Sequence, residues 1–394
     1  MKFKEYLMED VLDAIIDYRG KTPEKSDTGI PTLSAKSVKN NHINYAECYY
    51  ISEAEYKRFM VRGFPQKGDI LLTTEAPMGM VAKLDRADVA IAQRLLTLRG
   101  KEGVLDNDYL LYLLQSPYGE GLLKERETGT TVTGIKQAEF RRIIVKLPDI
   151  TIQKKIGSIL SAIDQKITCN TKINDNLQQQ AYAYFLRLFV ENADPSWRVG
   201  TIADLGTVVG GGTPSKAKPE YYTEDGIAWI TPKDLSVDKS KFIAHGENDI
   251  SELGFQNSST TMMPAGTVLF SSRAPIGYIA IASNEVTTNQ GFKSVVPHPE
   301  IGTPFIYYFL IHNLPLVESK ASGSTFKEVS ASVMKSVEAV IPDGDSIVKF
   351  NDFCRPVFEM QEKLEQENRK LAAMRDSLLP RLMSGEIDVA GIDI

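Results

Sequence analysis

Cysteine and histidine are scarce in this 394-residue sequence, and those that occur do not cluster. The three cysteines, Cys48, Cys169 and Cys354, are far apart and never form a Cys-x-x-Cys pair. Their spacing argues against a disulfide framework and against a thiolate metal site. The four histidines also lack metal-ligand spacing. We therefore expect a protein of a reducing compartment that binds no metal.

Long apolar runs are absent as well. No stretch approaches the roughly 20 apolar residues of a membrane span, and residues 1–6 lack the apolar segment of a secretory signal. We expect a cytoplasmic protein. A basic excess is also missing, since 45 Lys and Arg oppose 51 Asp and Glu, for a formal net charge of −6. Binding to nucleic acid would therefore depend on local basic groups or on a partner.

Catalytic signatures are missing or out of context. The sequence has no Gly-x-x-x-x-Gly-Lys-Ser/Thr phosphate loop, and no Pro-Pro dipeptide of the kind an adenine methyltransferase motif contains. Pro148-Asp149 followed by Asp164-Gln165-Lys166 formally resembles a nuclease pattern. However, Asp164 and Lys166 fall on a predicted helix, roughly 22 Å downstream, whereas that chemistry needs its acids clustered around a metal. We expect no catalytic residues and no cofactor in this chain.

The prominent feature of the sequence is an internal repeat with an offset of 194 to 198 residues. The clearest block is residues 68–79, which match residues 266–277. Because the matches keep their order, the repeat predicts two domains of one fold. The other matches pair Gly20-Lys21-Thr22-Pro23 with Gly211-Gly212-Thr213-Pro214, residues 29–36 with 226–233, Ala92-Gln93 with Asn289-Gln290, residues 128–131 with 322–325, and Leu147-Pro148-Asp149 with Ile341-Pro342-Asp343.

Each repeat predicts a mixed, β-rich α+β domain in which short strands precede a helix. In the first repeat Asn107 is expected to cap a helix over residues 108–125. In the second, Thr303-Pro304 is expected to open a helix through Leu310, and Pro315 to end or kink it. A Gly-Thr-Thr or Gly-Ser-Thr loop and a last strand follow. The strands are expected at residues 69–74, 89–98, 143–147, 268–272, 277–282 and 337–341.

Each repeat is followed by a long segment with apolar residues at helical spacing, the first over residues 152–189. A continuous helix of that length runs roughly 55 to 60 Å, which suggests a spacer. The domains expected are 1–150, 151–190 (spacer helix), 191–344, 345–385 (spacer helix) and 386–394 (tail). The two heptad seams are Ile163, Ile167, Asn170, Asn174, Leu177, Ala181, Tyr184 and Leu188, then Val357, Gln361, Leu364, Asn368, Leu371, Arg375, Leu378 and Leu382.

Connectivity predicts how these helices pair. The first helix leads from domain one to domain two, so a second helix that packs on it must run back. This gives an antiparallel coiled-coil pair with a pseudo-twofold axis, the domains at opposite ends and the two termini close together. The same axis places Asn174 near Gln361, a polar layer that could fix the register. The alternative is two unrelated amphipathic helices, each packed on its own domain.

The second half contains a set of distinctive motifs: Gly212-Thr213-Pro214 and residues 229–234, 269–277, 288–291 and 379–385. Together these motifs resemble the specificity subunit of type I restriction-modification enzymes, and the likeness covers the whole chain. The first half departs where Thr32, Ala35 and Glu75 replace Trp229, Pro232 and Arg273, so the roles of those positions do not transfer.

The resemblance implies two target-recognition domains that read an asymmetric, split site in double-stranded DNA, with helices that set their separation. It also implies docking of methyltransferase subunits that use S-adenosylmethionine on adenine N6, and of ATP-dependent restriction subunits. The chain itself would be non-catalytic. Two alternatives remain: a scaffold that binds no DNA, or the specificity subunit of a related methyltransferase-only or type IIB-like system.

The DNA-binding candidates are chosen by loop position and residue type. For each lysine among them, a solvated surface charge is an equally good interpretation. Asn289 and Gln290 could instead be turn residues that bond their own backbone. The candidates are Lys36, Gln93, Arg94, Lys136, Lys216, Lys233, Arg273, Asn289, Gln290 and Lys327.

Overall fold

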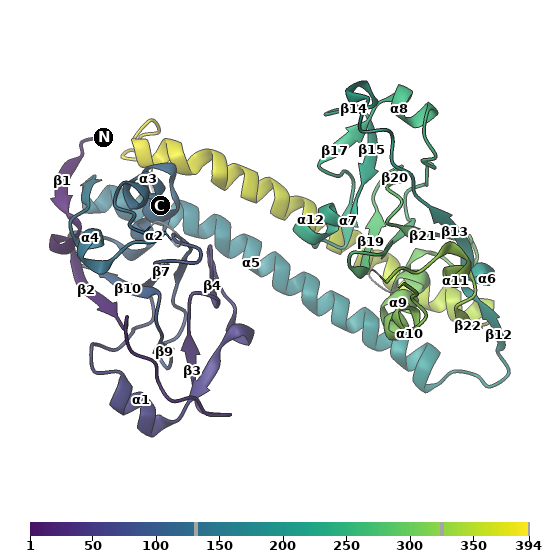
Figure 1. The fold of residues 1–394 in the computed structure, drawn as a ribbon, viewed down its shortest axis with the longest axis horizontal. Helices are drawn as coiled ribbons and strands as arrows, with labels where there is room; N and C mark the ends of the chain where they lie inside the picture. Colours follow the sequence, from purple (N-terminus) through teal and green to yellow (C-terminus); the bar gives the residue numbers. More distant parts are fainter. Residues whose placement is uncertain (130–132, 324–326, 393–394) are drawn as a thin grey trace. The chain divides into compact units, whose positions relative to one another are not determined.

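The computed structural model describes residues 1–129, 133–323 and 327–392, and the chain divides into two compact units (Figure 1). Unit 1 comprises Met1–Thr168 and Arg369–Ile394, and unit 2 comprises Cys169–Asn368. Each unit therefore holds one repeat together with part of both long helices. The predicted mixed α+β class with two repeated domains is confirmed.

The strands of unit 1 form small sheets around a core that includes Ile70, Leu72 and Leu96. Residues Thr32 and Ala90 are register partners in a parallel pair, β3 with β9. In order, the sheets are β1 (Lys4–Leu7) with β11 (Ile144–Leu147); β2 (Leu12–Asp17), β10 (Leu95–Gly100), β7 (Ile70–Thr73), β8 (Val81–Lys83); β6 (Tyr49–Ile51), β3 (Ile30–Leu33), β9 (Ala90–Ile91); and β4 (Val38–Lys39) with β5 (His42–Ile43). The helices are α1 (Glu53–Phe59), α2 (Asn107–Gln115), α3 (Pro117–Glu125) and α4 (Gln137–Arg141).

Unit 2 repeats the core of this topology, including the parallel pair, here β15 with β20 and Trp229 opposite Thr287, and adds β16 and β14 as edge strands of its two larger sheets. In order, its sheets are β12 (Arg198–Thr201) with β22 (Glu338–Ile341); β13 (Gly206–Gly210), β21 (Lys293–Pro297), β18 (Val268–Ser272), β19 (Ile276–Ala282), β16 (Phe242–Ile243); and β14 (Tyr222–Thr223), β17 (Asn248–Ile250), β15 (Ile227–Ile230), β20 (Thr287–Thr288). The helices are α6 (Ile202–Leu205), α7 (Pro232–Val237), α8 (Glu252–Gln256), α9 (Thr303–His312), α10 (Leu314–Ser319) and α11 (Ala331–Lys335).

Two predicted elements are wrong in the first repeat. The strand expected at 89–98 is two strands, β9 and β10, which belong to different sheets and are separated by a turn with Arg94 at a φ of +69°. The helix expected at 108–125 is also two, because Ser116 caps a new helix that has Pro117 in its first turn. Pro315 acts as predicted, since α9 ends at His312 and α10 begins at Leu314. The tips of the two expected threonine-rich loops, residues 130–132 and 324–326, lie outside the described residues.

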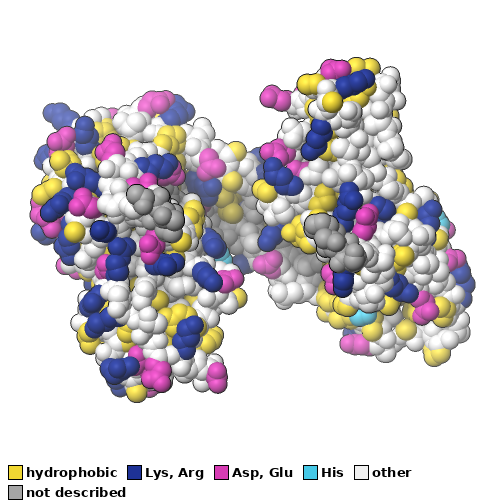
Figure 2. All heavy atoms as spheres, viewed as in Figure 1, with side chains coloured by type: hydrophobic (Ala, Val, Ile, Leu, Met, Phe, Trp, Pro, Cys, Tyr) yellow, Lys and Arg dark blue, Asp and Glu magenta, His cyan; other side chains and the backbone are white. Residues whose placement is uncertain are grey.

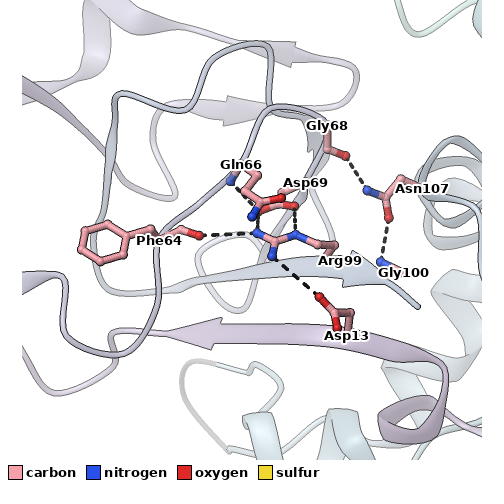
Figure 3. Close-up of polar contacts among 8 residues, drawn as sticks. All are labelled: Asp13, Phe64, Gln66, Gly68, Asp69, Arg99, Gly100 and Asn107. Carbon is pink, nitrogen blue, oxygen red and sulfur yellow. Dashed lines mark hydrogen bonds and ion pairs between the residues drawn. The ribbon is translucent and has the colours of Figure 1, made fainter. Parts of the chain in front are cut away.

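Asn107 is not the expected cap. Asp106 caps α2, accepting a hydrogen bond from the Tyr109 amide. Asn107 instead donates to the Gly68 carbonyl (2.8 Å) and accepts from the Gly100 amide (2.7 Å), as Figure 3 shows. In unit 2 the Thr303 hydroxyl donates to the matching carbonyl of Gly266 (2.7 Å). The repeated glycine is thus tied to the first residue of the following helix in both units.

The neighbouring residue Asp69 anchors a second polar contact in unit 1 (Figure 3). The residue is 1 % exposed, and its carboxylate accepts two hydrogen bonds of 2.8 Å from the Arg99 guanidinium. The Gln66 amide also donates to it (2.8 Å). A bidentate carboxylate pair of this kind raises the pKa of Arg99 and fixes the turn before β7.

The long helices are α5 (Ile150–Leu186), which continues as a π-turn over Arg187–Glu191, and α12 (Gly344–Ser384). In unit 1 the Arg375 guanidinium donates to the Asp164 carboxylate (2.7 Å). In unit 2 the Asn170 amide donates to Asn368 (2.9 Å), and Asn174 contacts Gln361. Within unit 2 the pairing is antiparallel, because the later residue of α5 meets the earlier residue of α12. The two helices therefore pack on each other, which contradicts the alternative of unrelated helices.

Every predicted seam position is at least partly buried, although Phe185 and Phe358, which lie outside the seams, are buried as well. Asn170 and Ala181 are 0 % exposed, Gln361 and Leu382 are 2 %, and Leu364 is 9 %. The remaining seam positions are partly buried: Ile163, Ile167, Asn174, Leu177, Tyr184, Leu188, Val357, Asn368, Leu371, Arg375 and Leu378. Among the described residues, no helix has the length and apolar character that a membrane crossing requires.

Candidate nucleic-acid interface

A surface hollow of about 670 Å³ in unit 2 brings five of the six second-half candidates together. We call it the unit 2 hollow. Trp229, 7 % exposed, forms part of its wall and donates from its indole nitrogen to the Gly212 carbonyl (3.0 Å). Two sequence motifs, the Gly-Thr-Pro turn and the Trp-Ile-Thr-Pro-Lys-Asp run, therefore meet here. The candidates that line the hollow are Lys216, Lys233, Arg273, Asn289 and Gln290.

Lys233 is positioned by the start of α7. Thr231 and Asp234 form a reciprocal capping box there, with Pro232 in the first turn. The Lys233 ammonium lies 2.5 Å from a carboxylate oxygen of Glu247, which raises the pKa of the lysine. Both side chains are more than 60 % exposed, so the pair itself adds little stability. It leaves a cation and an anion side by side on the wall of the hollow.

Arg273 lies at the turn between β18 and β19, directly before the cis peptide bond of Ala274 and Pro275. The Ser271 hydroxyl fixes this turn by donating to the Pro275 carbonyl (2.9 Å) and accepting from the Tyr278 amide (2.8 Å). In unit 1 the Thr73 hydroxyl does the same, donating to the Pro77 carbonyl (2.7 Å) and accepting from the Met80 amide (2.9 Å). The repeated Ala-Pro motif is therefore a shaped turn that presents residue 75 or 273.

Asn289 and Gln290 differ in what their side chains do. The Asn289 carboxamide oxygen accepts from the Gly291 amide (2.8 Å), which is the turn-forming role considered from the sequence. The Gln290 carboxamide oxygen accepts from the Thr213 hydroxyl. In unit 1 Gln93 contacts the matching threonine, donating to the Thr22 hydroxyl (2.6 Å). A Thr–Gln hydrogen bond thus joins the same two motifs in both repeats.

The first-half candidates are less concentrated. Gln93 also donates to the Lys21 carbonyl (3.0 Å), and Arg94 forms an ion pair with Glu75 (2.9 Å). Lys36 and Lys136 are exposed, the latter at the N-cap position of α4. Lys327, the sixth second-half candidate, is also exposed and does not line the unit 2 hollow.

Two charged residues near the hollow were missed from the sequence, Lys293 on β21 and Glu328. A Glu328 oxygen lies 3.6 Å from the Arg273 guanidinium, and the other lies 3.5 Å from the Lys293 ammonium. Lys293 also donates to the Gln290 carbonyl (3.3 Å). The only available signal was that each of them lies within three residues of a chosen candidate. Figure 2 shows acidic side chains interspersed with basic ones on the visible face of both units, so no broad basic surface marks a site there.

The nuclease-like residues have structural roles. Asp149 accepts hydrogen bonds from the amide (3.0 Å) and the hydroxyl (2.8 Å) of Thr151 at the start of α5. Asp164 accepts from the Tyr112 hydroxyl (2.6 Å) and from Arg375. Within residues 1–129, 133–323 and 327–392, no group of three or more His, Cys, Asp or Glu could hold a metal ion.

Comparison with known proteins gives one consistent result. Residues 2–179 and 195–353 match the family model described as the type I restriction modification DNA specificity domain. Over 177 residues the chain is 37% identical to the type I restriction enzyme MjaIX specificity subunit of Methanocaldococcus jannaschii, a match that spans 44% of this chain and 41% of that protein.

A longer alignment, 24% identical over 404 residues, covers 82% of this chain and 87% of the type I restriction enzyme HindI specificity subunit of Haemophilus influenzae. Among solved structures, the S subunit of a type I restriction-modification system from M. genitalium shares the fold, with a TM-score of 0.64 and 16% identity over 97% of this chain and 96% of that one.

Proposed function

The chain belongs to the family of type I restriction-modification DNA specificity proteins, and we propose that it reads an asymmetric, bipartite DNA site with one domain on each half-site. The observation that carries this proposal is that the two domains share one fold but present different side chains at one matching position. The shaped turn of the repeat presents Glu75 in unit 1 and Arg273 in unit 2. Side chains at base edges determine sequence preference, so the two domains prefer different half-sites.

The long helices set the length of the unread gap between the half-sites. Each runs more than 35 residues, 37 in α5 and 41 in α12, which is roughly 55 to 60 Å of helix. Their antiparallel packing and buried polar positions support a fixed register.

Methyltransferase subunits, and restriction subunits where they are present, dock on this chain and carry the catalysis. The partner methyltransferase uses S-adenosylmethionine to methylate adenine, flipping the base out of the helix. This chain contributes recognition and geometry. The capping role of Asp149 and the helical position of Asp164 support a non-catalytic chain, since neither is arranged for metal-dependent cleavage.

Sequencing of methylated adenines in the host genome tests the proposal. We expect one motif with two specific parts separated by an unread gap of fixed length, lost when this chain is deleted. A single continuous motif would contradict two-domain reading. No sequence-dependent DNA retention with the partner present would support the scaffold alternative. A bipartite motif without a co-purifying restriction subunit would indicate the methyltransferase-only or type IIB-like system.

A further inference from the structure

An arginine–glutamate pair lies at the edge of the unit 2 hollow. The guanidinium of Arg273 and the carboxylate of Glu328 are 3.6 Å apart, and both side chains are a little more than one third exposed. At that distance the two groups neutralise each other without being joined by a hydrogen bond. Among the described residues, no side-chain hydrogen bond occupies the arginine donors or the glutamate oxygens, so both groups remain available to a ligand.

Backbone hydrogen bonds hold the two segments that carry this pair. Glu328 and Ser322 exchange two backbone hydrogen bonds of 2.9 and 3.0 Å, which form an antiparallel bridge. The Val329 amide donates to the Ser272 carbonyl (3.0 Å), which sets this bridge beside the turn that carries Arg273. The backbone of both residues is thus fixed before any ligand arrives, which reduces the conformational entropy lost on binding.

Lys293 extends the pair toward Gln290. Its ammonium contacts both the Glu328 carboxylate and the Gln290 carbonyl, and its side chain is only 13 % exposed. Its ammonium, 3.5 Å from the carboxylate, gives Glu328 a second cationic neighbour. Glu328 therefore keeps an ionic partner when Arg273 engages a ligand.

We propose that Arg273 and Glu328 together read one G·C base pair in the half-site of the second domain. This inference rests on the proposed function. In the major groove guanine presents two acceptors, N7 and O6, and cytosine presents the N4 amino donor. Arginine matches the first pattern and glutamate the second. Guanine O6 and cytosine N4 are hydrogen-bonded to each other at about 3 Å, close to the separation of the two side chains.

The carboxylate also argues against a simple phosphate contact. An arginine that contacts only a phosphate carries no sequence information. With Glu328 beside it, an approaching phosphate meets a negative charge, whereas a G·C edge satisfies both groups. Glu328 thus converts a general DNA contact into a base-specific one.

Unit 1 contains a similar pair made from different positions. There the shaped turn supplies the acidic side chain, Glu75. Its carboxylate lies 2.9 Å from the guanidinium of Arg94, which is the basic side chain of the pair. The residue that matches Glu328 in the corresponding antiparallel bridge is Gly134, where a Cβ would lie 2.5 Å from the Thr74 carbonyl oxygen. A carboxylate could not occupy that position in unit 1. An acidic and a basic side chain therefore meet at this turn in both units, although the turn supplies the acid in unit 1 and the basic residue in unit 2. This recurrence indicates that the pairing of opposite charges has a role at the turn.

The test uses the full chain with its methyltransferase partner. The methylation motif is determined for the wild type, for Glu328→Gln and for Arg273→Gln. We expect both variants to relax the same single G·C position, in one half of the motif only, with discrimination against the other base pairs falling at least about 10-fold. Changes at two different positions, or in both halves, would overturn the pairing.

A matched control and a chemical probe separate the possible results. Glu318→Gln removes a more exposed carboxylate of unit 2 and should leave the motif unchanged. Replacing guanine at the affected position by 7-deazaguanine removes N7, and should weaken binding of the wild type but not of Arg273→Gln. Equal weakening of both would refute a contact between Arg273 and that guanine. If the proposed function itself fails, the wild type shows no bipartite motif. If only this inference fails, the motif is present and Glu328→Gln does not alter it.

Discussion

Asn174 and Gln361 each donate a side-chain hydrogen bond to the backbone carbonyl of the other, at 3.4 and 3.2 Å. The contact joins α5 to α12 in unit 2. Gln361 is 2 % exposed, and its carboxamide oxygen accepts from the Lys241 ammonium (2.9 Å). One glutamine therefore links the helix pair to the segment just before β16, within the recognition domain.

Lys241 is itself buried, at 7 % exposure. Its ammonium also donates to Gln178 (3.1 Å) and to the Tyr308 hydroxyl oxygen (3.4 Å), and lies 3.3 Å from the centre of the Phe358 ring. Burial lowers the pKa of this lysine. Tyr308 donates its own proton to Gln178 (3.0 Å). In its hydrogen bonds to Gln361, Gln178 and Tyr308 the lysine must therefore be the donor each time, which suits a protonated ammonium with three N–H groups.

We first predict that Gln361→Leu destabilises the protein more than Asn174→Leu. The glutamine substitution removes one acceptor from a buried ammonium, which costs about 1–3 kcal/mol. The asparagine substitution leaves its backbone carbonyl in place as an acceptor for Gln361. Urea denaturation followed by circular dichroism measures both. Equal losses would show that the contact with Lys241 contributes nothing measurable.

A second prediction concerns acid stability and the repeated Pro-Asp motif. The backbone amide and hydroxyl of Thr151 hold the pKa of Asp149 below its usual value, and those of Ser346 do the same for Asp343. As pH falls, each of these carboxylates is protonated in the unfolded state, where its pKa is about 3.9, at a higher pH than in the folded state, where its pKa is lower. The stability from these carboxylates is therefore present above that pH and is lost as pH falls through the lower folded pKa.

Asp149→Asn and Asp343→Asn test this point, because asparagine caps a helix as well as aspartate does but does not titrate here. The double variant should show a Tm that varies less between pH 5 and pH 2.5 than the Tm of the wild type. Asp149→Ala and Asp343→Ala should lower the Tm at neutral pH as well. A pH profile identical to wild type in the asparagine variant would mean that other groups govern acid unfolding.

Third, Asp69→Ala should destabilise the protein by about 3 kcal/mol. It leaves Arg99, 20 % exposed, without its bidentate partner, and breaking such a pair is costly when one member is fully buried. The matched variant in the other repeat is Thr267→Ala, which removes only a hydrogen bond to the Pro264 carbonyl (2.7 Å) and should cost about 1 kcal/mol. Chemical denaturation of both variants checks the difference, and a larger loss from Thr267→Ala would contradict it.

Fourth, inserting seven residues into each long helix should lengthen the unread gap of the methylation motif. Seven residues keep the heptad phase and add about 10 Å, or about three base pairs at 3.4 Å each. The two half-sites should stay the same. An insertion in only one helix is the control, since it breaks the register and should lower stability instead. A gap that stays constant in the double insertion would refute the spacer role.

Fifth, the purified chain alone should not cut DNA in the presence of Mg²⁺. Asp149 is engaged by Thr151 at a helix start, and Asp164 by Tyr112 and Arg375. With these contacts, neither carboxylate is placed in a cluster of the kind that metal-dependent cleavage requires. Metal-dependent cleavage that disappears in Asp149→Ala would show that the Pro-Asp motif is catalytic after all.

The sequence alone determined the repeat, the fold class and the two long helices. These features depend on patterns within one segment, such as helical periodicity, turn motifs and their ordered recurrence, and local patterns remain visible in a linear chain. It was less reliable where a single residue redirects the backbone, as at Arg94 between β9 and β10, or at Ser116 and Pro117 between α2 and α3.

Only the tertiary structure decided which charges face one another. Arg273, Lys293 and Glu328 are separated by 20 or more residues, and nothing in their local sequence marks them as neighbours. Their meeting depends on a strand register, on a shaped turn and on the antiparallel bridge between Ser322 and Glu328. The same holds for Lys241, which lies buried on the helix pair. Electrostatic contacts act through space, so their partners are set by the fold and not by the spacing of residues along the chain.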